Sequence, residues 1–152
     1  MEHLVYCNDK EKVLPKILSG EKTMIIRGAG GRKIPHGRVF KEEALYFIEK
    51  GTRIIKAKAK VISVQNFTGL TEEQAKEIIE KNQNKLCLTL AQIERWTKKC
   101  LCLIEFDSLE TIEPLEFEHQ SNMDDWLILE SIFDVVKGSS KKYTYENARF
   151  KK

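Results

Sequence analysis

Gly20-Glu21-Lys22-Thr23-Met24-Ile25-Ile26-Arg27, followed directly by Gly28-Ala29-Gly30-Gly31-Arg32-Lys33-Ile34-Pro35-His36-Gly37-Arg38, is the stretch that decides the fold. Its first part is rich in residues that favour strands, so it predicts a short β-strand from Thr23 to Arg27. Side chains alternate between the two faces of a strand. One face of this strand is therefore expected to pack in the core, while the other presents Arg27.

The same stretch combines cations with a flexible backbone. Five Lys or Arg residues and no Asp or Glu lie between Lys22 and Arg38. The glycines leave backbone N–H groups free to converge on an anion such as a phosphate, a carboxylate or a nucleic-acid backbone. The predicted binding residues are Lys22, Arg27, Gly28, Gly30, Gly31, Arg32, Lys33 and Arg38.

A simpler interpretation stays open for this stretch. Gly20 would then end a helix, the strand would be ordinary, and Gly28–Gly31 would form a mobile loop with solvated cations. The glycine spacing fits neither the Walker A motif nor GxGxxG, which argues against a nucleoside-triphosphate site.

The length and composition predict one soluble domain. The 152 residues suffice for a single core, which we place in residues 1–137, followed by a basic and disordered tail in residues 138–152. No apolar run approaches the roughly 20 residues that span a bilayer, and the N-terminus does not resemble a signal peptide. We therefore expect a cytoplasmic protein without membrane contacts, whose oligomeric state is left open.

The cysteines and histidines do not predict a metal site. Four cysteines are too few for a disulfide scaffold in a chain of 152 residues, and Cys100 and Cys102 alternate in a strand-like segment. The three histidines are scattered without metal-ligand spacing. We expect structural thiols, no metal and no cofactor.

Charge is distributed unevenly along the chain. Residues 1–60 hold 14 Lys/Arg and 7 Asp/Glu, residues 61–136 hold 6 and 15, and residues 137–152 hold 6 and 1. A basic half that contains the glycine-rich loop indicates an anionic partner there. Pairing of the basic and acidic halves within the molecule is the alternative. The row Lys56, Lys58 and Lys60 is interpreted as the solvated face of a strand.

Hydrophobic periodicity and turn residues predict the remaining elements. Capping-box residues open a helix at Thr71, a second helix follows Thr89, and a further amphipathic helix begins at Asp124 or Asp125 and ends at Gly138. The other predicted elements are a strand from His3 to Cys7, a helix through Val13–Leu18, an antiparallel pair Ala44–Ile48 and Ile54–Val64, and a strand Cys100–Phe106 before an acidic surface segment, 105–118.

This order of elements resembles the ASCH family, a branch of the PUA-like superfamily. The resemblance covers roughly residues 3–106 and depends on a Gly-x-Lys-x-x-x-x-Arg motif, Pro35 and Gly37, and the helix entry Phe67–Glu73. It implies an α+β fold, namely a small, mostly antiparallel β-barrel with flanking helices and a cleft lined by Lys22 and Arg27. Relatives are associated with RNA or modified nucleosides, and Phe40, Tyr46, Phe47 and Phe67 are candidates for base stacking.

Some ASCH-like proteins are amidohydrolases of acylated cytidine, but this sequence departs from their Lys, Thr and Glu constellation. Ile25 occupies the position that carries Thr in those hydrolases, and Leu86 or Cys87 corresponds to their carboxylate. Lys22 and Thr23 are left as weak catalytic candidates. The main hypothesis is therefore a module that binds RNA or a nucleotide-like anionic ligand. The alternatives are an amidohydrolase of a modified nucleoside and a purely protein-binding domain.

Overall fold

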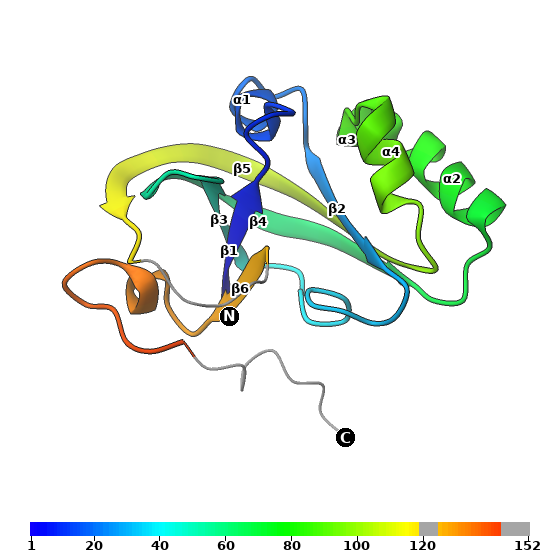
Figure 1. Cartoon of the computed structure of the whole chain (residues 1–152). Helices are drawn as coiled ribbons and strands as arrows, with labels where there is room; N and C mark the ends of the chain where they lie inside the picture. Colours follow the sequence, from blue (N-terminus) through cyan, green and yellow to red (C-terminus); the bar gives the residue numbers. More distant parts are fainter. Residues whose placement is uncertain (119–124, 144–152) are drawn as a thin grey trace.

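A strongly curled sheet of six strands forms the centre of the computed structural model, which describes residues 1–118 and 125–143 (Figure 1). The strand order is β2-β5-β4-β3-β1-β6, with β1 parallel to β3 and every other pair antiparallel. The strands are β1 (Glu2–Cys7), β2 (Met24–Ala29), β3 (Ala44–Glu49), β4 (Ile54–Phe67), β5 (Cys100–Glu116) and β6 (Trp126–Leu129). This curled mixed sheet with flanking helices confirms the predicted α+β fold class.

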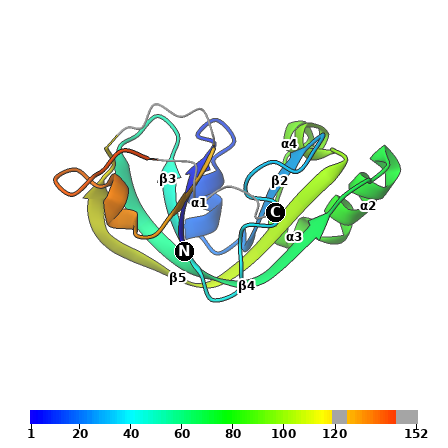
Figure 2. The same cartoon turned by 90° about the horizontal axis from the view of Figure 1, so that it is seen from below.

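The helices occupy two positions relative to the sheet. Figure 2 shows α1 inside the curl of the sheet and α2, α3 and α4 beside β2 and β5. The helices are α1 (Val13–Leu18), α2 (Glu72–Lys81), α3 (Gln83–Leu86), α4 (Leu90–Trp96) and the 3-10 helix η1 (Ile132–Val135). None of the helices in the described part of the chain is long and apolar enough to cross a membrane.

Both faces of β2 are covered, one by the core inside the curl and the other by the helices. Ile25 packs in the main core inside the curl, with residues of α1, β1, β3, β4 and β5. Met24 and Ile26 pack on the opposite face against the helices α2–α4. The predicted alternation along this strand is confirmed, because Arg27 follows Ile25 on the side of the curl. The expectation that only one face would pack in the core is wrong, because Met24, Ile25 and Ile26 are all buried between the curl and the helices.

Two capping boxes fix the helices beside β2 and β5. In α2 the Thr71 side chain accepts from the Gln74 backbone, and the Gln74 side chain accepts in return from the Thr71 backbone. Thr89 and Gln92 repeat this arrangement at the start of α4. Both predicted helix starts are confirmed, and the capping box holds each glutamine side chain in one orientation.

The C-terminal helix predicted after Asp125 is wrong. Trp126–Leu129 forms the short edge strand β6 beside β1, and only Ile132–Val135 is helical, as a 3-10 turn. All four residues of β6 are buried, so the apolar run serves both faces of a covered strand rather than one stripe of a helix. Of the predicted tail, residues 144–152 lie outside the described residues.

β5 is much longer than the predicted strand. It continues through the acidic segment to Glu116, and in this part each partly buried side chain follows two exposed ones. Its first part pairs with both β2 and β4, whereas its second part pairs with β4 alone. Pro114 is tolerated because this second part is an edge, where no neighbouring strand needs its missing N–H donor.

Candidate functional site

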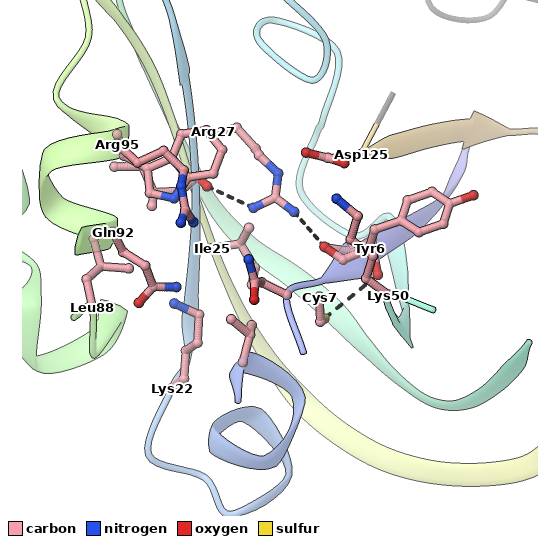
Figure 3. Close-up of a pocket in the computed structure, with 15 residues that line it drawn as sticks. Tyr6, Cys7, Lys22, Ile25, Arg27, Lys50, Leu88, Gln92, Arg95 and Asp125 are labelled. Carbon is pink, nitrogen blue, oxygen red and sulfur yellow. Dashed lines mark hydrogen bonds between the residues drawn. The ribbon is translucent and has the colours of Figure 1, made fainter. Parts of the chain in front are cut away.

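A cavity of about 290 Å³ lies between the beginning of β2, the end of β1 and the helix α4 (Figure 3). Lys22 and Arg27, the two cations of the sequence motif, both line it. The other polar residues that line it are Asn8, Lys50, Gln92, Arg95 and Asp125. The rest of the lining consists of Val5, Tyr6, Cys7, Val13, Ile25, Ile26, Leu88 and Trp96.

Lys22 is a buried cation without an acidic partner among the described residues. Its side chain is only 4% exposed, and its ammonium donates to the backbone carbonyl of Leu86 at 2.5 Å. Burial, together with the nearby positive charge of Arg27, lowers the pKa of Lys22 to about 8. Burying an ammonium group without a counter-ion is costly, so its position requires an explanation beyond stability.

Arg27 is held rigidly at the centre of the site. Its two terminal nitrogens donate to the carbonyls of Ile26 at 3.0 Å and Tyr6 at 2.9 Å. The guanidinium carbon lies 5.5 Å from the ring centre of Trp96 and 5.7 Å from that of Trp126, within the range of cation–π attraction. Each terminal nitrogen carries a second N–H beyond the one used here, so the group can still bind an acceptor.

Gln92 faces Lys22 across the cavity. It is 4% exposed, and its side-chain oxygen accepts from the backbone N–H of Thr89 at 2.9 Å. Because an N–H must face the oxygen, the capping box assigns the amide nitrogen to the opposite side. Figure 3 shows this nitrogen directed toward the ammonium of Lys22. No described residue accepts from it, so two donors face each other in the cavity.

The remaining charged walls are partly neutralised. Arg95 pairs with Glu11 at 2.6 Å, and Glu11 also accepts from the Thr89 hydroxyl at 3.0 Å. Asp125 lies on the far side of Arg27 from Lys22 (Figure 3), and Lys50 is exposed near it. Two positive charges thus remain uncompensated among the described residues around the cavity.

The cavity does not assemble a catalytic group around the weak candidates Lys22 and Thr23. Thr23 is not among the lining residues, although it adjoins Lys22, and its backbone joins Lys85 and Phe106. Burial raises the pKa of Cys7 to about 12, so this thiol stays neutral and is a poor nucleophile. Asp125 is the carboxylate of the wall, and Arg27 separates it from Lys22.

The glycine-rich loop borders a second, smaller cavity. Gly28, Gly31 and Lys33 line this space of about 50 Å³, which shares Arg27, Trp96 and Asp125 with the main cavity. Gly30 and Arg32 are exposed, and Arg38 is half-buried; none of these three lines either cavity. The structure thus brings Lys22 and Arg27 to one cavity. Of the other predicted residues, Gly28, Gly31 and Lys33 line the adjoining smaller cavity.

The predicted stacking residues lie elsewhere. Tyr46 and Phe47 are buried core residues, Phe67 packs against the helices, and Phe40 is 59% exposed. The aromatic residues at the cavity are Tyr6 and Trp96, with Trp126 behind Arg27. Sequence reasoning also missed Gln92, whose available signal was the Thr89-x-x-Gln92 capping box that fixes its orientation.

The cysteines are mostly buried, and the lysine row of β4 lies at the surface, as the sequence predicts. Cys7, Cys100 and Cys102 are buried and Cys87 is half-buried, all as free thiols. Within residues 1–118 and 125–143, no three His, Cys, Asp or Glu side chains cluster as metal ligands. Lys58 and Lys60 lie on the surface of β4 and pair with Glu110 and Glu42, so this row is a solvated face.

Comparison with solved structures places the fold. The chain is similar to the ASCH protein of Zymomonas mobilis, with a TM-score of 0.58 and 13% identity over 76% of this chain and 73% of that one. Two point mutants of the same protein match with the same TM-score and identity. No protein-family model and no curated protein matches the sequence. The fold is therefore that of ASCH domains.

Proposed function

We propose that this ASCH-type fold binds RNA or a nucleotide-like anionic ligand in the cavity lined by Lys22 and Arg27. The buried ammonium of Lys22, which no carboxylate neutralises among the described residues, is the observation that carries the proposal. An anion in the cavity would supply the missing charge and would accept from Lys22, Gln92 and Arg27 together. The cost of burying Lys22 is then offset when ligand binds.

The cavity suits a nucleotide in size and chemistry. Its volume of about 290 Å³ is at the lower end of small-molecule sites, large enough for one nucleoside unit rather than an extended chain. Trp96 and Tyr6 offer ring surfaces, and backbone carbonyls and the fixed Gln92 amide offer polar contacts. Polar groups placed in an otherwise apolar wall determine how a ligand is oriented.

The amidohydrolase alternative is not favoured by this geometry. Amide hydrolysis requires a nucleophile or activated water, a general base and a group that stabilises the oxyanion. Lys22 and Gln92 could serve the last role, but Thr23 is outside the cavity and Asp125 lies beyond Arg27. The site can bind an anion without any further group.

Binding of fluorescently labelled RNA tetranucleotides and of nucleoside monophosphates to the full chain tests the proposal. Lys22→Met keeps the aliphatic length of the side chain and removes its charge, so it should weaken binding by at least about 10-fold, as expected for a charge-assisted hydrogen bond. Lys56→Met, on the exposed face of β4, is the matched control. Equal binding by wild type and Lys22→Met, or no binding of either ligand class, would contradict the proposal.

A further inference from the structure

The inner end of the cavity, where Lys22 faces Gln92, is lined by two buried polar side chains. Its polar side-chain groups are the ammonium of Lys22 and the amide of Gln92. One lone pair of the Gln92 oxygen is engaged by the Thr89 N–H, so the side chains at this end present mainly donors. Such a set favours a ligand group that carries several acceptor oxygens.

The charges of the residues around the cavity indicate the charge of the ligand group that binds there. Lys22, Arg27, Lys50 and Arg95 line the cavity, while Asp125 is the lining carboxylate and Glu11 pairs with Arg95. The described residues therefore leave an excess of two positive charges. A phosphate monoester carries between one and two negative charges near neutral pH, and an internal phosphodiester carries only one.

Lys22 and Gln92 are each 4% exposed, whereas Lys50 and Arg95 at the other walls of the cavity are exposed, so the Lys22 end is the more enclosed one. Val13 and Leu88 also line the cavity, and both are buried apolar side chains. Lys22 itself is tied to Leu86 of α3. An internal phosphodiester has to continue in two directions, whereas a terminal phosphate needs one entrance only.

We infer that the Lys22–Gln92 end of the cavity binds a terminal phosphate monoester, so that the ligand is a nucleotide or the phosphorylated end of an RNA. This inference rests on the proposed function and names the ligand class of the same site. Lys22 contributes the positive charge, and Gln92 contributes two fixed N–H donors. Arg27 contributes the N–H groups of its terminal nitrogens that do not donate to the carbonyls of Ile26 and Tyr6. Either end of an RNA could supply this group.

Three otherwise identical RNA tetranucleotides distinguish the possibilities at pH 7: one with a 5′-phosphate, one with a 3′-phosphate and one with hydroxyl groups at both ends. Fluorescence anisotropy with an internal label measures the affinity of the full chain for each. One of the phosphorylated forms should bind about 10- to 100-fold more tightly than the hydroxyl form, the range expected for charge-assisted hydrogen bonds. The preferred end identifies the source of the phosphate.

Gln92→Glu is the decisive variant. The carboxylate keeps an oxygen for the Thr89 N–H, so the capping box survives, but it places a negative charge where the phosphate would lie. The preference for the phosphorylated end should disappear. Gln74→Glu makes the same change in the matching capping box of α2, away from the cavity, and should retain the preference. Lys22→Met should also abolish the preference, which provides a second variant if Gln92→Glu does not fold.

The outcomes separate the inference from the proposed function. Equal affinity for all three tetranucleotides would overturn the terminal phosphate while leaving RNA binding in place. A preference that persists in both Gln92→Glu and Lys22→Met would overturn its location. Failure of every tetranucleotide and mononucleotide to bind would overturn both.

Discussion

Because of Lys22, the free energy of unfolding of the unliganded protein should increase as the pH is raised above 8. Burial and Arg27 lower the pKa of Lys22 to about 8 from its ordinary value of 10.5. The folded protein therefore holds this proton less tightly than the unfolded chain does. By linkage, protonated Lys22 reduces the free energy of unfolding below pH 8, and the penalty is relieved as the pH rises from 8 toward 10.5.

The size of this effect follows from the two pKa values. The full difference between the two pKa values corresponds to roughly 3.5 kcal/mol, at about 1.4 kcal/mol for each pKa unit. Between pH 7.0 and pH 9.5 the wild type should gain about 2 kcal/mol relative to Lys22→Met, because other titrating groups are common to both proteins. Solvent screening reduces this figure little, since the side chain is 4% exposed.

Urea denaturation of both proteins at the two pH values measures the difference directly. Lys56→Met controls for the loss of one surface lysine. A difference between wild type and Lys22→Met that does not change between pH 7.0 and pH 9.5 would refute the reasoning, because it would mean that the ammonium remains solvated in the folded protein.

Two further predictions concern the walls of the site. Gly28→Ala should reduce the free energy of unfolding by about 1–3 kcal/mol in urea denaturation, because its Cβ would lie 2.9 Å from Leu101 and 3.1 Å from the Trp96 carbonyl. Gly30→Ala meets nothing within 4 Å and should change little, so equal effects of the two would argue against this close approach. For binding of a short RNA, the logarithm of the binding constant plotted against the logarithm of the salt concentration should have a slope of about −1.4 to −2.1, which corresponds to two or three phosphates at about −0.7 each. Lys33→Ala, in the smaller cavity, should make this slope less steep by about 0.7. An anisotropy titration with an unchanged slope would exclude Lys33 from the phosphate path.

Local patterns in the sequence were sufficient where a short segment determines its own structure. The capping box at Thr71 predicts the start of α2, and Thr89 before an apolar run predicts the start of α4. The alternation along β2 predicts that Arg27 lies on the same face as Ile25. The run Trp126–Leu129 was misinterpreted because a short apolar run fits a helix and a fully buried strand equally well. Only its position beside β1 decides between them.

The candidate site was predictable only in part, because its parts come from distant segments. The Gly-x-Lys-x-x-x-x-Arg motif places Lys22 and Arg27 near each other, since both belong to or adjoin one strand. Gln92, Trp96 and Trp126 reach the same region through the curl of the sheet and the packing of α4. Nothing local in those segments indicates that they would surround an arginine.

The curled sheet is open, and its two edge strands are β2 and β6. Arg27 extends from β2 to the carbonyl of Tyr6 at the end of β1 and to the ring of Trp126 on β6. This side chain therefore acts as a crosslink across the opening between strands that share no backbone hydrogen bond. A ligand that draws the guanidinium toward the cavity would therefore have to weaken the contacts by which Arg27 joins these strands.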